Sequence, residues 1–171
     1  VVGRLQAVGD GADIRVIVDY AHTPDALERA IRALKETDNA GALWVLFGCG
    51  GDRDPGKRAE MGAIACQFAD RVIVTSDNPR SEAPEAIIDD ILRGCDDSPI
   101  VESDRAAAIA LVIAEAKVGD IVLIAGKGHE TYQEIEGVRL PFNDAEHAAQ
   151  HLRDGSAWGG NRPTVHDQAH P

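Results

Sequence analysis

Short apolar runs alternate in this chain with longer segments whose apolar residues recur at helical spacing, and this alternation strongly constrains the fold. The runs are rich in β-branched residues and apolar at nearly every position, as in a parallel sheet covered on both faces. The pattern predicts an α/β fold with a Rossmann-like open, mostly parallel sheet and helices on both faces. The predicted strands are 14–20, 43–47, 71–75, 100–101 and 121–125.

The segments between these strands carry helix signals. Thr23 is a good N-cap, Pro24 follows it at the first helical position, and apolar residues then recur at helical spacing. Near the end of the chain, Glu-Gly-Val separates two short β-like runs, so a late β-hairpin is predicted over 132–141. Further helices are predicted over 58–69, 84–92, 103–116 (with Ser103 as its cap) and 143–152.

Composition is that of one soluble domain. With 171 residues and 44% apolar content, the chain is expected to fold over residues 1–152 and to end in an irregular, flexible tail over 153–171. A formal charge of −12 argues against nucleic acid as a partner. No apolar run approaches the roughly 20 residues that a membrane helix needs, so no membrane partner is expected. The three cysteines form no Cys-x-x-Cys pair, which favours a reduced, cytoplasmic protein.

Polar segments directly follow four of the predicted strands. Ligands of open α/β sheets bind outside the carboxyl ends of the strands, so we expect these segments to lie together at one edge of the sheet. Each could also be only a solvated turn, since Gly, Asn and Pro are common turn residues. The segments are 19–25 (DYAHTPD), 48–58 (GCGGDRDPGKR), 76–82 (SDNPRSE) and 126–130 (GKGHE).

The second of these segments contains G-x-x-x-x-G-K, the beginning of a phosphate-binding loop, over 51–57. Arg58 stands where such a loop has the Ser or Thr that binds Mg²⁺. Pro55 also stiffens a stretch whose amides would all have to point inward. We therefore do not expect a phosphate-binding loop here.

The charged residues of the four segments indicate a different ligand. Arg53 and Arg80 each offer a guanidinium that can hold a carboxylate through paired hydrogen bonds. Glu130, with Asp77 expected nearby, offers negative charge for an ammonium group. A ligand with separated carboxylates and amines, either an amino acid or a diamino-diacid, fits this set.

Other candidate residues are weaker. His147 and His151 are four residues apart on a predicted helix, but no third ligand accompanies them, so no metal site is predicted. The cysteines have no neighbouring His at a catalytic spacing, and buried, unreactive thiols are expected.

Taken in order, the motifs VDYAHTPDAL, FGCGGDRDPGKR, TSDNPR and AGKGHETYQ resemble the C-terminal domain of the Mur ligases, from about residue 3 to residue 152. Asp-Asn-Pro-Arg is the most specific of them and is similar to the motif of members that add meso-diaminopimelate rather than lysine. The resemblance implies an ATP-dependent ligase of peptidoglycan synthesis. Such an enzyme joins meso-diaminopimelate to the D-glutamate of UDP-N-acetylmuramoyl-L-Ala-D-Glu through an amide bond.

The resemblance also implies roles for particular residues. Arg4 and Asp19 match residues that contact the phosphate and the ribose of ATP, respectively. The family usually has Pro-Gly-Arg followed by Glu, where this chain has Val2-Gly3-Arg4 and then Gln6, which is a departure from the pattern. The residues matched to meso-diaminopimelate binding are Arg53, Asp77, Asn78, Pro79, Arg80, Gly126 and Glu130.

Several parts of such a ligase have no match in these residues. They are the phosphate-binding loop, the Mg²⁺ ligands and the pocket for the UDP-linked substrate. The chain also begins at Val1 rather than Met, so we expect a piece of a longer ligase that is inactive alone, and we identify no catalytic residue in it. Two alternatives are a stand-alone amino-acid-binding module and the C-terminal domain of another Mur or folylpolyglutamate-type ligase. Asp-Asn-Pro-Arg argues against a folylpolyglutamate-type ligase.

Overall fold

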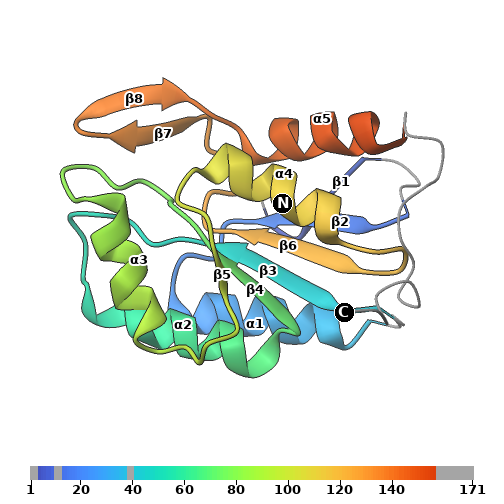
Figure 1. Ribbon diagram of the computed structural model, residues 1–171, viewed down its shortest axis with the longest axis horizontal. Helices are drawn as coiled ribbons and strands as arrows, with labels where there is room; N and C mark the ends of the chain where they lie inside the picture. Colours follow the sequence, from blue (N-terminus) through green and yellow to red (C-terminus); the bar gives the residue numbers. More distant parts are fainter. Residues whose placement is uncertain (1–3, 10–12, 38–40, 157–171) are drawn as a thin grey trace.

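The computed structural model describes residues 4–9, 13–37 and 41–156. They form a six-stranded sheet, a separate hairpin and helices on both faces of the sheet, so the predicted α/β architecture is confirmed (Figure 1). The elements are β1 (Gln6–Val8), β2 (Arg15–Asp19), α1 (Pro24–Lys35), β3 (Leu43–Phe47), α2 (Gly56–Phe68), β4 (Arg71–Val74), α3 (Pro84–Leu92), β5 (Ile100–Val101), α4 (Arg105–Glu115), β6 (Ile121–Ala125), β7 (Tyr132–Ile135), β8 (Val138–Pro141) and α5 (Asp144–Ser156).

The strand order in the large sheet is β1-β2-β6-β3-β4-β5. The strands from β2 to β5 are parallel to their neighbours, and β1 pairs antiparallel with β2 at the edge. The strand β6 is the last in sequence among the strands of this sheet, yet it lies in the middle of the sheet between β2 and β3. This insertion decides which loops are neighbours at the carboxyl edge.

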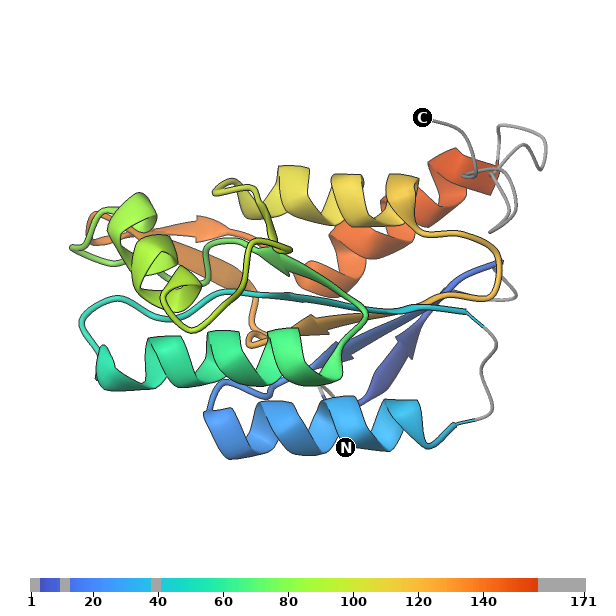
Figure 2. The same ribbon diagram turned by 60° about the horizontal axis from the view of Figure 1, so that its bottom comes forward.

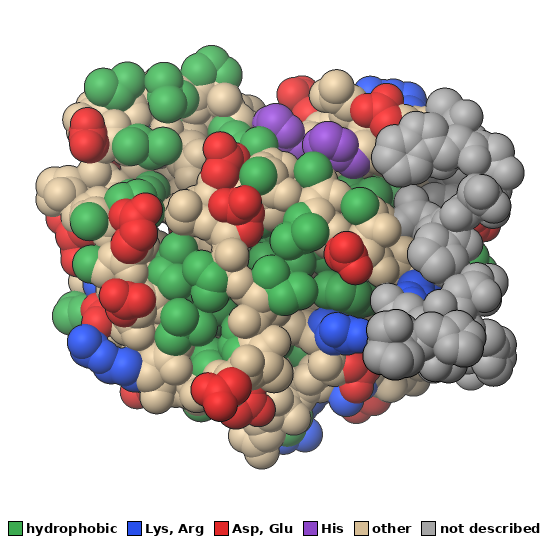
Figure 3. Space-filling view, viewed as in Figure 1, with side chains coloured by type: hydrophobic (Ala, Val, Ile, Leu, Met, Phe, Trp, Pro, Cys, Tyr) green, Lys and Arg blue, Asp and Glu red, His purple; other side chains and the backbone are tan. Residues whose placement is uncertain are grey.

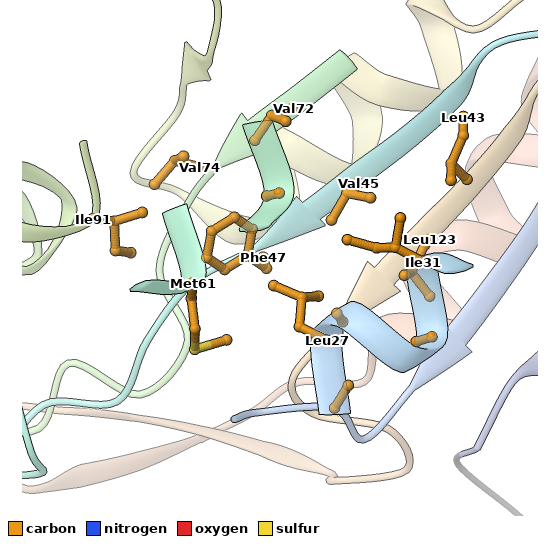
Figure 4. Close-up of a cluster of buried hydrophobic side chains, with 14 of the residues drawn as sticks. Leu27, Ile31, Leu43, Val45, Phe47, Met61, Val72, Val74, Ile91 and Leu123 are labelled. Carbon is orange, nitrogen blue, oxygen red and sulfur yellow. The ribbon is translucent and has the colours of Figure 1, made fainter. Parts of the chain in front are cut away.

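Two apolar clusters hold the helices to the sheet. Inward side chains of α1, α2 and α3 pack on one face, and those of α4 and α5 pack on the other. Figure 2 shows α1 and α2 side by side beneath the sheet. In the first cluster, Phe47 of β3 lies between Met61 of α2 and Leu27 of α1 (Figure 4). This packing fixes the ends of β3 and α2, and so the loop that joins them.

Side-chain caps define where α1 and α4 begin. Thr23 caps α1 as predicted, and its Oγ1 accepts a hydrogen bond from the Ala26 amide at 3.2 Å. The cap of α4 is Asp104 rather than the predicted Ser103, because the Asp104 carboxylate accepts from the Ala107 amide. The helix α5 continues to Ser156, four residues beyond the predicted boundary at 152. The remainder of the predicted tail, 157–171, lies outside the described residues.

The short strand β1 was not predicted. Its three residues are exposed or half-buried and carry no alternation, so only its pairing with β2 defines it. Within the described part of the chain, no helix is both long and apolar enough to cross a membrane. On the face shown in Figure 3, acidic side chains are spread widely, and the described residues form no continuous basic patch there.

Candidate functional site

Four polar loops leave the carboxyl ends of four neighbouring strands, as predicted. In their order along the sheet edge they are the 19–25 loop after β2, the 126–130 loop after β6, the 48–58 loop after β3 and the 76–82 loop after β4. Because β6 lies between β2 and β3, the 126–130 loop lies between the 19–25 loop and the 48–58 loop.

A cavity of about 410 Å³ lies among these loops. Besides the predicted residues, Lys57, Met61 and Cys49 line it, and Tyr20 and His22 form one side. Pro79 is buried beneath the loop and is absent from the lining. The cavity thus brings together six of the seven residues predicted to bind the amino acid: Arg53, Asp77, Asn78, Arg80, Gly126 and Glu130.

The 48–58 and 76–82 loops are joined directly through their backbones. The Gly51 amide donates to the Asn78 carbonyl at 2.8 Å, and Arg80 Nη1 donates back to the Gly51 carbonyl at 2.9 Å. Arg80 has a positive φ of 53°, and its amide donates to the carbonyl of Glu134 in β7 at 2.9 Å. A positive φ is unusual for a residue with a side chain and has to be held by its surroundings. Here the hairpin and the 48–58 loop hold it.

The side chains of the two predicted arginines differ in how firmly their surroundings hold them. Arg80 is half-buried and fixed by these contacts, and its Nε lies 3.6 Å from the Glu134 carboxylate. Arg53 is exposed, and its Nη1 donates to the backbone carbonyl of the preceding residue, Asp52, at 2.9 Å. Arg80 therefore offers a preorganised position for an anion, while Arg53 can turn toward one.

A buried lysine, which we did not predict, lies behind the cavity. The Nζ atom of Lys127 is 3.2 Å from Asp77 Oδ1, an ionic contact outside hydrogen-bond geometry, and 3.5 Å from Glu130 Oε1. It also donates to Asn78 Oδ1 at 2.7 Å and to the Tyr132 carbonyl at 3.0 Å. Asp77 and Glu130 were expected to face a ligand ammonium alone, and they instead share a cation within the protein.

A second buried cation was also missed. Arg58 was interpreted only as the start of a helix, and it does lie in the first turn of α2. Its guanidinium is buried and donates to Glu82 at 2.7 and 3.2 Å, to Asp90 at 3.0 Å and to the Gly50 carbonyl at 3.1 Å. The hydrogen bond to Glu82 is the main reason that the pKa of Arg58 lies above its ordinary value. This side chain ties α3 and both cavity loops together.

Replacing Glu82 with glutamine is expected to destabilise the protein at neutral pH, by an amount that shrinks on acidification. Arg58 first, and then the Asp52 amide, hold the pKa of Glu82 below its ordinary value. The carboxylate therefore stabilises the folded state above the unfolded pKa of about 4.3, and this stability is lost as the pH falls through the lower folded pKa. Urea unfolding of both proteins from about pH 7 to about pH 3 measures the difference.

The matched control for this prediction is Glu60→Gln, which removes one exposed carboxylate from α2. Its effect on the free energy of unfolding should be small at every pH. A loss in the Glu82→Gln variant that stays constant across the pH range would contradict the assigned role of the Arg58 hydrogen bond.

A second cavity, of about 470 Å³, lies on the other side of the 19–25 loop and is lined by Arg4 and Asp19. The Asp19 carboxylate is buried and accepts hydrogen bonds from the amides of Leu5 at 2.7 Å and Ala21 at 2.8 Å. Four lone-pair sites on a carboxylate leave room for further donors such as hydroxyl groups. Arg4 is exposed at the rim, so these two residues fit a phosphate and a sugar hydroxyl of a nucleotide.

Tyr20 and His22 line both cavities, so the two spaces are neighbours. The His22 Nδ1 atom is 2.8 Å from the Tyr20 carbonyl, and the two rings meet edge to face at 4.7 Å. The rings stand between the predicted nucleotide side and the predicted amino-acid side. A molecule in one cavity can therefore be brought close to a molecule in the other.

The described residues do not form a metal centre. Among them there is no group of three or more His, Cys, Asp or Glu side chains that could hold a metal ion. His147 stacks on Phe142 with ring centroids 4.4 Å apart. Burial raises the pKa of Cys49 to about 12, and burial together with a hydrogen bond to Cys66 raises the pKa of Cys95 to about 12 as well, although Cys66 and Cys95 are only partly buried.

Comparison with known proteins identifies the family. A sequence model described as "Mur ligase, glutamate ligase domain" matches residues 3–128. The chain belongs to the Mur ligase family. Members of this family are ATP-dependent ligases, typically with Mg²⁺, and the matched region is their C-terminal domain.

Relatives with known names show which members of the family this Mur ligase domain is similar to. It is 57% identical over 159 residues to UDP-N-acetylmuramoyl-L-alanyl-D-glutamate–2,6-diaminopimelate ligase of Chromobacterium violaceum, covering 92% of this chain and 32% of the relative. A solved structure of an enzyme with that name superposes with a TM-score of 0.84 at 46% identity, over 90% of this chain and 32% of that one. The chain thus spans about a third of the length of these relatives.

The same fold also occurs in a solved structure of lower sequence identity. The bifunctional folylpolyglutamate synthase/dihydrofolate synthase of Yersinia pestis has a TM-score of 0.59 at 23% identity, over 74% of this chain and 28% of that chain. At this identity the likeness concerns the fold alone. Since the relatives of high identity are diaminopimelate ligases, neither a folylpolyglutamate-type ligase nor a stand-alone binding module is favoured.

Proposed function

We propose that this Mur ligase domain binds meso-diaminopimelate in the cavity of about 410 Å³ and part of ATP in the neighbouring one. In the complete enzyme it would present the amino acid to the D-glutamyl carboxylate of UDP-N-acetylmuramoyl-L-Ala-D-Glu. The observation that carries this proposal is the convergence of six predicted residues, from three loops, on one cavity. The name of the relatives of high identity supports the choice of substrate.

The polar groups of the cavity suit an amino acid with two charged ends. Arg80 is fixed and Arg53 can turn, so each can hold one carboxylate through charge-assisted hydrogen bonds. Asn78 accepts two hydrogen bonds at Oδ1, from Lys127 and from the Glu134 amide. Within the described residues nothing accepts from its Nδ2 amide, so this group can donate to a ligand carboxylate.

The domain's contribution to the reaction is orientation. ATP, when bound, supplies the phosphoryl group that activates the D-glutamyl carboxylate. Asp19 and Arg4 would hold its ribose and phosphate on one side of the Tyr20 and His22 rings, and the clamped amine would lie on the other. Fixing the amine near the activated carbonyl replaces a bimolecular encounter with an oriented one.

The same arrangement accounts for selection against lysine. Lysine lacks the second carboxylate and would leave a guanidinium in the site without its partner. Losing one charge-assisted hydrogen bond costs roughly 1.5–3 kcal/mol, or about tenfold to a hundredfold in affinity.

A cytoplasmic location also belongs to this proposal, supported by three cysteines that form no disulfide with one another.

Replacing Arg80 with methionine is expected to weaken meso-diaminopimelate binding by about tenfold to a hundredfold and lysine binding much less. An NMR titration of the 171-residue chain with each amino acid measures both affinities and locates the shifts. Arg71→Met is the matched control, because Arg71 begins β4, the strand that leads into the loop of Arg80, and lies at the opposite edge of the sheet. Equal losses for both amino acids, or shifts outside the cavity loops, would contradict the assignment.

The ligase activity is tested with a chimera. This chain replaces the matching segment of the Chromobacterium violaceum relative, to which it is 57% identical. The chimera should form the amide bond with meso-diaminopimelate and ATP, and the chain alone should not turn over ATP. A folded chimera without this activity would refute the proposed function.

A further inference from the structure

Lys127 is held inward by the backbone of its own loop. Gly126 and Gly128, on either side of it, have positive φ values of 117° and 54°. Both of their amides donate to the Asp19 carbonyl, at 3.0 and 3.2 Å. Glycine adopts such angles readily, and the two residues let the chain turn twice around the lysine. The side chain is fully buried, and its ammonium lies behind the cavity of about 410 Å³.

The ammonium of Lys127 contacts three of the residues proposed to bind the amino acid. Two are the carboxylates of Asp77 and Glu130, at 3.2 and 3.5 Å, and the third is Asn78, whose Oδ1 accepts from it at 2.7 Å. These contacts join the 76–82 loop to the 126–130 loop. Lys127 itself is absent from the cavity lining, whereas all three partners belong to it.

The charges of this cluster add to a single negative charge. Two carboxylates and one ammonium leave one unit of negative charge facing the cavity, and one ammonium group of the ligand balances it. Without Lys127 the same wall would carry two negative charges at nearly the same place. At neutral pH meso-diaminopimelate has two carboxylates and two ammonium groups and is neutral, whereas lysine carries a net positive charge. The more negative wall would attract lysine more strongly than meso-diaminopimelate.

We propose that Lys127 is a specificity-determining positioning residue, which sets the cavity wall to one net negative charge and so helps to exclude lysine. This inference rests on the proposed function and deepens it. Lys127 acts through Asp77 and Glu130 and does not touch the ligand. Selection against lysine then has two parts, the carboxylate partners Arg53 and Arg80 on one side and the limited negative charge on the other.

Titration of the 171-residue chain with meso-diaminopimelate and with L-lysine tests this inference. The readout is the ratio of the two dissociation constants, because damage to the fold weakens both ligands while a change of charge moves the ratio. Lys127→Met should shift the ratio about tenfold toward lysine, as expected for one added charge acting at short range in a partly buried site. Lys127→Arg keeps the charge and should keep the ratio, even if both affinities fall.

Glu130→Gln provides a test in which the charge of the wall changes in the opposite direction, and this test does not depend on the stability of the Lys127 variants. It lowers the negative charge of the wall to zero, so the ratio should move away from lysine. Lys35→Met is the control for loss of a lysine elsewhere, since Lys35 ends α1 and lies 3.9 Å from Asp70, outside the cavity. An unchanged ratio in Lys127→Met, or in Glu130→Gln where the former does not fold, would overturn the inference and leave Lys127 a purely structural residue.

The outcome for the wild-type chain separates this inference from the proposed function. If the chain binds neither amino acid, the wall is not preformed in it and the inference fails. Amide formation by the chimera would then leave the proposed function standing, and an inactive folded chimera would remove both.

Discussion

Replacing Asp144 with alanine is expected to lower the free energy of unfolding by about 3–5 kcal/mol, because it leaves a buried guanidinium without its counter-charge. Asp144 and Arg105 have fully buried side chains, and Arg105 donates to both Asp144 oxygens, at 2.8 and 2.7 Å. Burial alone would lower the pKa of Arg105, but the charge and hydrogen bonds of Asp144, together with the charges of Asp77 and Glu130, outweigh it, and the pKa stays above its ordinary value. Arg105 remains charged in the variant because an arginine side chain does not lose its proton in proteins, and this charge has to be accommodated.

This ion pair also supports the edge of the sheet that carries the site. Arg105 donates to the carbonyl of Ser76 at 3.0 Å and to that of Ala125 at 3.1 Å. These carbonyls lie where β4 and β6 pass into the 76–82 and 126–130 loops. The Asp144→Ala variant should therefore lose affinity for the amino acid as well as stability.

Thermal and urea unfolding measure the first effect, and for a chain of this size each kcal/mol corresponds to roughly 2–4 °C in Tm. Glu146→Ala, an exposed change in the same turn of α5, is the matched control and should stay within about 0.5 kcal/mol of wild type. A double variant, Arg105→Met with Asp144→Leu, should recover much of the loss because it leaves no buried charge. A loss below about 1 kcal/mol in Asp144→Ala would contradict the account.

The layers of this fold could be predicted from the sequence because buried strands and helices each have a characteristic spacing of apolar residues. The run Leu43–Phe47 is buried at all five positions, and so is Ile121–Ala125, as expected for central parallel strands. The rule that loops at the carboxyl edge form the site then placed four polar segments together without knowledge of the strand order. The missed strand Gln6–Val8 has no such periodicity, since its pattern is exposed or half-buried throughout.

The charged residues that hold the site together could not be predicted in the same way. A lysine or arginine in a polar segment is normally exposed, and only a partner distant in sequence makes its burial favourable. The partners here are far along the chain, since Lys127 reaches Asn78 over 49 residues and Arg105 reaches Asp144 over 39. The glycines beside Lys127 were a visible signal, because two of them around one lysine indicate a turn built to direct that side chain.

Replacing Gly51 with alanine is expected to abolish most amino-acid binding, with a loss of about a hundredfold or more. A Cβ at this position would lie 1.9 Å from the Pro79 carbonyl oxygen and 2.7 Å from the Pro79 carbonyl carbon. Both are backbone atoms, so one loop has to move away from the other. This movement breaks the Gly51–Asn78 backbone hydrogen bond and the bond from Arg80 to Gly51. Two ligand contacts, each worth roughly 1.5–3 kcal/mol, would shift together.

Gly56→Ala is the matched control, because its Cβ would meet only the Asp54 side chain among the described residues, at 3.2 Å, and the residue lies in the first turn of α2. Alanine is favourable in a helix, so this variant should bind and unfold as wild type does. For Gly51→Ala, overpacking should cost about 1–3 kcal/mol of stability, which leaves a folded protein for the titration. Wild-type affinity in folded Gly51→Ala would mean that the cavity does not depend on the junction of the two loops, and would contradict this account.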